Sequence, residues 1–300
     1  HYPLAMVAKL VRVGPAGWSY PDWEGRVYPR PHPRSFHPLA FLARYVECVE
    51  LNSSFYALPQ ARHAARWVDL VADRPSFRFL AKLHRSFTHD VGADVDAADA
   101  RAFQEGLAPL AQAGRLAALL AQFPVSFHRT TIGRERVHRL VDLFHERPLV
   151  LELRHRSWFT AEAMQELEHL GVGVAHIDLP AARDHPPTTH ATLGTPGYVR
   201  LHGRNDRTWF NPKAGRDDRY DYLYGRDELA GIAQRIREVA AHGRETYLVT
   251  NNHYGGQALA NALEIRGLLD DRPPLAPETL VQSFPHLRPL TRPEGQQRLF

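Results

Sequence analysis

The stretch "PLVLELRH" (residues 148–155) has the pattern of a buried strand that ends in polar side chains. Leu151 and Leu153 alternate with Glu152 and Arg154, and successive side chains of a strand point to opposite faces. The helical pattern "TAEAMQELEHLG" (160–171) follows it directly. A strand followed by a helix is the unit from which parallel sheets are built.

This strand and helix unit recurs along the chain. Further apolar, strand-like segments lie at 11–18, 48–55, 77–84, 116–124, 173–179, 197–203 and 246–253. Amphipathic segments follow most of them, at 60–73, 93–114, 133–147, 226–243 and 257–269. Eight such repeats predict a TIM-type (β/α)8 barrel. An open doubly wound sheet is the alternative, because residues 180–196 show no clear helix.

The barrel accounts for most of the chain as a single domain. With 300 residues, 44% of them hydrophobic, one large core is feasible. We predict the barrel over residues 9–269 and a Pro-rich strap or tail over 270–300, where prolines interrupt regular structure.

Composition limits the class of protein. Cys48 is the single cysteine, so no internal disulfide is expected, and no apolar run approaches the length of about 20 residues that a membrane helix needs. We expect a soluble, cytoplasmic protein. The net charge of +4 and the pI of about 9.3 permit an anionic ligand, including nucleic acid.

Five predicted strands carry two polar residues each near their carboxyl ends, at alternating positions that would share the inner face of a barrel. These pairs are Glu50 and Asn52, Lys82 and His84, Glu152 and Arg154, His176 and Asp178, and Arg200 and His202. Single polar residues come from two other strands, Gln122 and either Asn251 or Asn252. One pair alone would be read as a neutralised ion pair, but ten such groups predict a ligand site, because desolvating them costs several kcal/mol each.

Two chemistries are open at this ring. Glu50, Glu152, Asp178, His176 and His202 are residue types that bind a divalent metal, which would activate water, although no spacing motif links them. The alternative is a cationic pocket for phosphate or carboxylate, and it requires fewer assumptions. Its members would be Lys82, His84, Arg154, Arg200 and His202.

Loops at the same end of the barrel add aromatic and glycine residues. Trp18 and Tyr20 follow the first strand, and the long loop 203–225 mixes arginines with aromatic rings, as in sites for phosphates and stacked bases. Gly255 and Gly256 precede a helix, where their N–H groups could bind phosphate. No nucleotide-cofactor motif is found, and the cofactor stays unknown.

Six stretches together resemble the YecE-like family, also called domain of unknown function 72. They are "GWSYPDWEGRVYP", "VELNSSFYALP", "FRFLAKLHRSFTH", "LELRHRSWF", "YVRLHGR" and "NNHYGGQALANAL", in order within residues 11–266. The resemblance implies a single TIM-type barrel and a loose kinship to sugar isomerases and endonuclease IV-like barrels, but no known reaction. The family's motif positions include Trp18, Tyr20, Glu50, Asn52, Tyr56, Lys82, Glu152, Arg154, Arg200, His202, Asn251, Asn252 and Gly256.

The last five residues, "QQRLF", resemble the peptide that binds the bacterial sliding clamp. Gln296, Leu299 and Phe300 match that peptide, whereas Gln297 and Arg298 depart from it. The tail would therefore bind a DNA sliding clamp or pack on its own barrel.

Three functions remain open at this point. The first is an enzyme on a phosphate-bearing substrate, with nucleic acid and DNA repair as one setting. The second is a sugar isomerase or lyase, with Glu50 or Glu152 as base, His176 or His202 as acid and Lys82 as electrostatic stabiliser. The third is a ligand-binding adaptor without catalysis.

Overall fold

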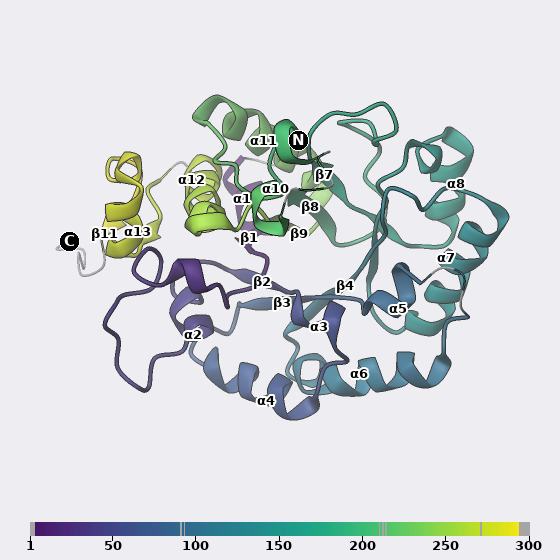
Figure 1. Ribbon diagram of the computed structural model, residues 1–300, viewed down its shortest axis with the longest axis horizontal. Helices are drawn as coiled ribbons and strands as arrows, with labels where there is room; N and C mark the ends of the chain where they lie inside the picture. The colour runs from purple at the N-terminus through teal and green to yellow at the C-terminus, as the bar shows by residue number, and fades with distance from the viewer. Residues whose placement is uncertain are drawn as a thin grey trace.

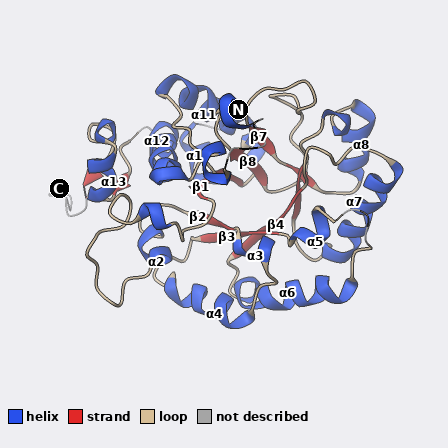
Figure 2. Ribbon diagram, in the orientation of Figure 1, coloured by secondary structure: helices blue, strands red, loops and turns tan. Residues whose placement is uncertain are grey.

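The computed structural model describes residues 4–90, 92, 94–209, 211, 213, 215–270 and 272–293. Parallel strands lie in the middle of the molecule and helices surround them (Figures 1 and 2). The chain therefore has a mixed α/β fold with parallel sheets, of the TIM-like kind.

The strands form two principal sheets. One has the order β2-β3-β4-β5-β6, with β2 (Cys48–Leu51), β3 (Arg78–Lys82), β4 (Leu116–Gln122), β5 (Leu149–Glu152) and β6 (Gly173–Val174). The other has the order β1-β9-β8-β7, with β1 (Val11–Pro15), β9 (Thr246–Thr250), β8 (Gly197–Leu201) and β7 (His176–Asp178). All eight predicted strand segments are confirmed, with β6 and β7 sharing the segment 173–179.

Backbone hydrogen bonds connect the two sheets. The Glu47 N–H donates to the Val13 carbonyl oxygen at 3.1 Å, and the Gly17 N–H donates to the Glu50 carbonyl oxygen at 2.9 Å. Ala175, which separates β6 from β7, donates to the Leu151 carbonyl oxygen at 2.9 Å. Neighbouring strands of different sheets therefore contact each other through their backbones.

Six longer helices cover the outside of the strands (Figure 1). They are α4 (Ala61–Leu70), α6 (Ala97–Gln112), α7 (Thr131–Phe144), α8 (Ala161–His169), α11 (Arg226–Val239) and α12 (Gln257–Asp270). Side-chain caps fix three of their starts: Asp96, Thr130 and Thr160 each accept a backbone N–H of the first turn. Each of the six corresponds to a segment with predicted helical periodicity.

Shorter helices fill the connections. They are α1 (Leu4–Leu10), α2 (Pro38–Leu42), α3 (Ser53–Tyr56), α5 (Arg85–Thr88), α9 (Asp206–Trp209), α10 (Arg216–Arg219) and α13 (Glu278–Ser283), with 3-10 turns at Pro21–Trp23, Arg156–Trp158, Ala241–Gly243, Tyr254–Gly256 and Pro285–Leu287. Residues 179–196 contain neither helix nor strand, as the sequence pattern indicated.

Two layers of apolar side chains follow from strand alternation. Cys48, Leu80, Val150 and Tyr198 belong to an inner cluster to which both sheets contribute, together with Ala16, Ala118, Leu120, Ala175, Ile177, Tyr247 and Val249. The alternate residues, such as Val49 and Leu151, pack against the helices. Charged residues near the carboxyl ends of the strands therefore lie on the same inner face as this cluster, as Glu152 does two residues after Val150.

For residues 173–179, the prediction of which side chains point inward is wrong. Ala175 and Ile177 belong to the inner cluster, so His176 and Asp178 point outward, toward the helices. The error arose because both faces of this strand are closed, and apolar and polar residues alternate without showing which set is inside.

The loop after β1 is joined to the loop after β9. The indole N–H of Trp23 donates to the His253 carbonyl oxygen at 2.8 Å, and Asp22 accepts the Gly255 N–H at 2.6 Å. At the opposite end, Arg266 of α12 donates to the carbonyl oxygens of residues 8 and 11 at 3.1 and 2.7 Å. Side chains therefore join the loop after β1 to the loop after β9, and the start of β1 to α12.

Residues 272–293 contain more regular structure than their prolines suggested. β10 (Leu275–Ala276) pairs in parallel with β11 (Arg292–Pro293), and α13 lies between them in the chain. Leu280 and Leu287 are buried in the same cluster as Trp23 and Val27, and the Thr279 hydroxyl donates to the Val27 carbonyl oxygen at 2.6 Å. The division into 9–269 and 270–300 stays a prediction.

Candidate functional site

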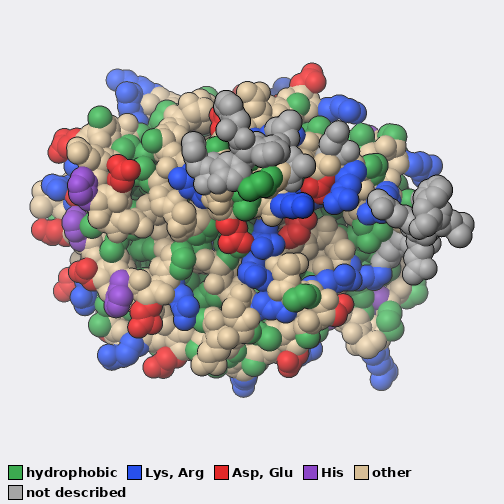
Figure 3. All heavy atoms as spheres, turned by 180° about the vertical axis from the view of Figure 1, so that it is seen from behind, with side chains coloured by type: hydrophobic (Ala, Val, Ile, Leu, Met, Phe, Trp, Pro, Cys, Tyr) green, Lys and Arg blue, Asp and Glu red, His purple; other side chains and the backbone are tan. Residues whose placement is uncertain are grey.

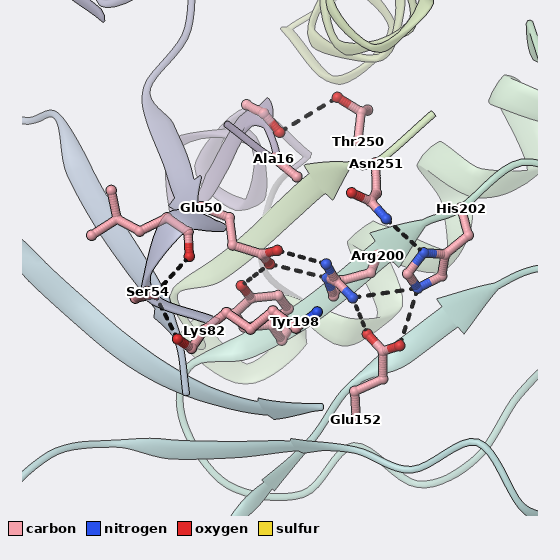
Figure 4. Close-up of polar contacts among 12 residues, drawn as sticks. Ala16, Glu50, Ser54, Lys82, Glu152, Tyr198, Arg200, His202, Thr250 and Asn251 are labelled. Carbon is pink, nitrogen blue, oxygen red and sulfur yellow. Dashed lines mark hydrogen bonds and ion pairs between the residues drawn. The ribbon is translucent and has the colours of Figure 1, made fainter. Parts of the chain in front are cut away.

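A buried ion-pair cluster lies at the carboxyl ends of β2, β5 and β8 (Figure 4). The Arg200 guanidinium donates to both oxygens of Glu50, through Nη2 at 2.5 Å and Nε at 3.0 Å, and to Glu152 through Nη1. Glu50 and Glu152 are 0% exposed. Arg200 is therefore held between two carboxylates, an arrangement that requires every group to be paired.

Each of the two carboxylates also accepts a hydrogen bond from a further side chain. Tyr198, two residues before Arg200 on the inner face, donates its hydroxyl to Glu50 at 2.7 Å. The Nε of Arg154 donates to Glu152 at 2.7 Å. Although burial alone would raise it, the charges of Arg200 and Arg154 hold the pKa of Glu152 well below its ordinary value. Glu152 is therefore a fixed negative charge near neutral pH.

His202 extends this cluster as a neutral group. Burial lowers its pKa to about 4, even though contact with Glu152 acts in the opposite direction. Its Nε2 lies 3.2 Å from the Glu152 carboxylate, and Asn251 Nδ2 lies 3.0 Å from its Nδ1. These contacts fit a neutral ring that donates from Nε2 and accepts at Nδ1. The sequence-predicted residues Glu50, Glu152, Arg200, His202 and Asn251 are thus brought together.

Lys82 is a cation of the site whose pKa is strongly lowered. Its Nζ lies 4.0 Å from the centre of the Phe55 ring. Burial, and then the charge of Arg200, lowers its pKa to about 7. The two carboxylates Glu50 and Glu152 are already balanced by Arg154 and Arg200, so little net negative charge remains to keep Lys82 protonated.

A pocket of about 510 Å³ opens above the cluster. Lys82, Arg154 and Arg200 line it together with the amides of Asn52, Gln122 and Asn251. Glu50 and Glu152 lie beneath it and are fully buried. Among the described residues that line the pocket, Asp22 is the one acidic side chain, and it already accepts the Gly255 N–H. The pocket therefore presents cations and amides to a ligand.

Aromatic side chains form the wall of this pocket. Trp18 and Trp67 meet edge to face with 5.6 Å between ring centres, and Tyr20 stacks on His253 at 4.6 Å. Tyr56, which is 63% exposed, and Tyr220 complete the aromatic lining. Such a wall can stack on a planar group or on the apolar face of a sugar ring.

His176 and Asp178 were wrongly predicted to face the site. His176 stacks on His190 at 3.9 Å and contacts the Thr192 hydroxyl at 3.0 Å. Asp178 accepts two hydrogen bonds from Arg204, at 2.8 and 2.7 Å, and one from the Tyr224 hydroxyl at 2.9 Å. Both side chains stabilise the contact between the strands and the outer layer, and neither lines the pocket.

Four further predicted ligand-binding residues have structural roles outside the pocket. His84 caps α5 by accepting the Ser86 N–H at 3.3 Å. Asn252 is fully buried and donates to the Tyr222 carbonyl oxygen and to Asn261. The N–H groups of Gly255 and Gly256 bond Asp22 and the His253 carbonyl oxygen, so they are not available to phosphate.

The two glycines are required for close packing. Gly255 has φ +59°, and a Cβ there would lie 2.5 Å from Arg26 Nη1, while Gly256 has φ +89° and would meet Val27 at 2.8 Å. Positive φ and close contact both favour glycine. The Gly-Gly pair thus shapes the turn before α12.

Several pocket residues were missed from the sequence. Trp67 and His63 lie four residues apart on α4, on one face of that helix, a spacing that could have suggested a shared wall. Tyr198 lies on the same strand face as Arg200, so alternation alone could have placed it beside Glu50. Tyr220, by contrast, belongs to the loop 203–225, whose aromatic rings the sequence predicted at this end of the barrel.

The predicted metal set does not assemble. Within the described part of the chain, no group of three or more His, Cys, Asp or Glu side chains is placed to hold a metal ion. The Arg200 guanidinium occupies the position between Glu50 and Glu152 that a bridging cation would take. The donor set therefore fits an anionic ligand better than a divalent metal.

Comparison with known proteins establishes the family. The model of the family described as "Protein of unknown function DUF72" matches residues 12–283. The chain belongs to this family. The resemblance predicted from the sequence motifs is thereby confirmed, and the family's description leaves its function open.

Related proteins support this assignment. The chain is 29% identical over 278 residues to the UPF0759 protein YunF of Bacillus subtilis, covering 87% of this chain and 95% of YunF. It is 25% identical over 185 residues to the UPF0759 protein YecE of Escherichia coli K12, covering 61% of this chain and 63% of YecE.

Crystal structures of two DUF72 family proteins are similar to this one. The Thermotoga maritima protein is 34% identical and superposes with a TM-score of 0.75 over 87% of this chain and 99% of that chain. The Enterococcus faecalis protein is 23% identical, with a TM-score of 0.74 over 87% and 95% of the two chains, and it supports the fold.

Two other predictions concern membrane-spanning helices and the C-terminal peptide. Among the described residues, no helix has both the length and the apolar character needed to cross a bilayer. Gln296, Leu299 and Phe300, the residues of the clamp-like peptide, lie outside the described residues.

Proposed function

We propose that this protein is an enzyme that binds a small phosphate- or carboxylate-bearing compound in the pocket above Arg200. The observation that carries the proposal is the separation of charges. Lys82, Arg154 and Arg200 line the pocket, whereas Glu50 and Glu152 are sealed beneath it. A ligand anion would therefore meet cations first.

Arg154 is the side chain best placed to hold the anion. Its Nε bonds Glu152, and among the described residues its two terminal amino groups have no hydrogen-bond partner. A guanidinium fixed through Nε presents both of these groups in one plane, which suits a carboxylate or a phosphate. Its side chain is 17% exposed, at the boundary between the cluster and the pocket.

We further propose that the two sheets act as one closed barrel. The backbone bonds between β1 and β2 and from Ala175 to Leu151 support this. Closure would place the ends of all eight strands around a single pocket, where barrel enzymes assemble their active sites.

Isothermal titration calorimetry with sodium sulfate tests the anion site, with glucose as a neutral control. An Arg154→Gln variant should bind sulfate about ten- to a hundredfold more weakly, because one charged hydrogen-bond pair contributes about 1.5–3 kcal/mol. Arg85→Gln, outside the pocket and paired with Asp90 only at 4.0 Å, is the matched control. Equal sulfate affinity in native protein and Arg154→Gln would contradict the proposal.

Proton uptake gives an independent test of the same site. An anion beside Lys82 should raise its pKa from about 7, so sulfate binding at pH 7 should take up as much as about half a proton per chain. Titrations in buffers of different ionisation enthalpy measure this uptake. Binding without any proton uptake would mean that the anion does not lie near Lys82.

A small carbohydrate is the second candidate ligand, favoured by the aromatic wall of Trp18, Trp67 and Tyr20. Under this alternative, Glu50 and Glu152 are poorly suited as bases, since Arg200 binds both. The test is a panel of neutral sugars in a thermal shift assay. If a sugar raises the melting temperature and sulfate does not, the ligand is a carbohydrate rather than an anion.

Nucleic acid as ligand, and the sliding clamp as partner, also stay proposals. In Figure 3, both basic and acidic side chains are spread over the visible face, so a nucleic-acid backbone would meet charges of both signs among the described residues. Deleting residues 296–300 and measuring affinity for a purified clamp tests the tail. Unchanged affinity would remove the clamp from consideration.

A further inference from the structure

Lysine is rare in this chain, and one lysine lies in the pocket. Of the 37 cationic residues, 34 are arginine and three are lysine, at positions 9, 82 and 213. Lys9 and Lys213 are exposed, whereas Lys82 lines the pocket. Arginine holds an anion with a permanent charge, but only lysine provides an amine that can lose its proton and react.

The surroundings of Lys82 leave its amine available to a ligand. In the portion of the chain that the structure describes, Nζ makes no hydrogen bond and no ion pair, and it lies over the Phe55 ring at 4.0 Å. The Ser54 hydroxyl donates to the Lys82 carbonyl oxygen at 2.6 Å. Its backbone is thereby fixed at the end of β3, and its side chain extends into the pocket.

We propose that Lys82 is an amine nucleophile that forms an imine with the carbonyl group of an anionic substrate. The inference rests on the anion site proposed above and names the class of compound. The substrate would carry a carbonyl group and a negatively charged group, as an oxo acid or a phosphorylated aldehyde or ketone does. Arg154 would hold the anion while Lys82 meets the carbonyl carbon.

The step balances without an oxidant or reductant. The Nζ lone pair forms a bond to the carbonyl carbon, the C=O π bond breaks, and one amine proton moves to the oxygen to give a carbinolamine. The C–O bond then breaks, the hydroxyl leaves as water with a proton taken from solvent, and the nitrogen lone pair forms the C=N bond. The product is a positively charged imine next to the bound anion.

The charge balance of the site supports a reactive amine. With a pKa of about 7, about half of the Lys82 side chains would be neutral at pH 7, whereas an ordinary lysine is almost fully protonated. Charged and titratable groups face it from several elements: Glu50 at β2, Glu152 and Arg154 at β5, Arg200 at β8 and His89 after α5.

Reductive trapping tests the proposal. The native protein is incubated with glyoxylate and cyanoborohydride at pH 7, which converts an imine into a stable secondary amine. The adduct adds the mass of glyoxylic acid less one oxygen atom. Peptide mapping should show Lys82 modified at least about tenfold faster than Lys9 or Lys213, because far more of it is neutral. Labelling of Lys82 no faster than that of the two exposed lysines would overturn the proposal.

Two controls make the result specific. A variant with Lys9→Arg and Lys213→Arg keeps Lys82 as its one lysine and should label like the native protein at that position. Lys82→Arg should lose the pocket adduct, and its melting temperature shows whether it is folded. At glyoxylate concentrations far below saturation, the rate of Lys82 labelling should rise with pH with a midpoint near 7, and a midpoint near 10 would also refute the inference.

A ligand without a carbonyl separates this inference from the proposed function. Glycolate has the charge and size of glyoxylate but cannot form an imine. If glycolate or sulfate binds and Lys82 is not trapped, the anion site stands and the imine is wrong. If neither anion binds, the proposed function itself fails.

Discussion

Replacing Arg200 by methionine should destabilise the protein strongly, because it leaves two buried carboxylates without the cation that they share. Glu50 and Glu152 are both 0% exposed and both accept hydrogen bonds from the same guanidinium. Methionine has a similar length but neither charge nor donor. Among the described residues, Glu152 then keeps Arg154 as its cationic partner, and Glu50 keeps the Tyr198 hydroxyl.

The magnitude follows from the burial of the cluster. Removing one partner of a buried ion pair costs about 3–5 kcal/mol. For a chain of 300 residues, a loss of about 4 kcal/mol corresponds to a fall of about 6 °C in melting temperature. Differential scanning calorimetry of native and Arg200→Met protein at pH 7 measures this fall.

The pH dependence checks the physical cause. The folded pKa of Glu152 is depressed, so its contribution to native stability is present above the unfolded value near 4.5 and is lost as the pH falls through the folded value. Without Arg200 this pKa rises, and the difference between the proteins should shrink as the pH falls below about 4.5. A melting temperature within about 2 °C of native at pH 7 would show that the carboxylates are not dependent on Arg200.

Three other predictions concern Asp178, Gly255 and His202. Asp178→Asn should destabilise by about 3 kcal/mol by weakening the bidentate Arg204 pair, yet leave sulfate affinity unchanged, since Asp178 faces outward; a large loss of affinity at equal stability would contradict that placement. Gly255→Ala should cost about 1–2 kcal/mol in urea unfolding, because φ is +59° and a Cβ would displace Arg26. The free energy of unfolding should fall between pH 6.5 and about 4, because the unfolded chain takes up a proton that folded His202 does not; His202→Gln should flatten this slope, and an unchanged slope would assign it to other histidines.

Strand positions were predictable because they depend on local pattern. Every predicted strand contains an apolar run, and the residues on alternate positions of β2, β3, β5 and β8 separate into inner and outer clusters as expected. The inward placement of Glu50, Lys82, Glu152 and Arg200 followed from that alternation.

The errors arose where the alternation of apolar and polar residues does not show which face of a strand is inside, or where no alternation exists. In 173–179 both faces of the strand are covered, so a shift of one residue exchanges the inside for the outside. The roles of Gly255 and Gly256 depend on contacts with residues more than two hundred positions earlier in the sequence. The role of Asn252 depends on Tyr222, about thirty positions earlier. Distances of that kind in the sequence carry no periodic signal, and only the folded chain shows that these groups are already bonded.

Side-chain hydrogen bonds at both ends of β1 affect where the molecule unfolds locally. Trp23 and Asp22 join the loop after β1 to the loop after β9, and Arg266 of α12 binds the Val11 carbonyl oxygen at the start of β1. The strand nearest the N-terminus is thus a poor place for local unfolding to begin. Residues 179–196, which cross between β7 and β8 without a covering helix, have fewer regular hydrogen bonds to break. In native-state hydrogen exchange we therefore expect β7 to lose protection before β1. Local unfolding would then begin between β7 and β8 rather than where β1 pairs with β9.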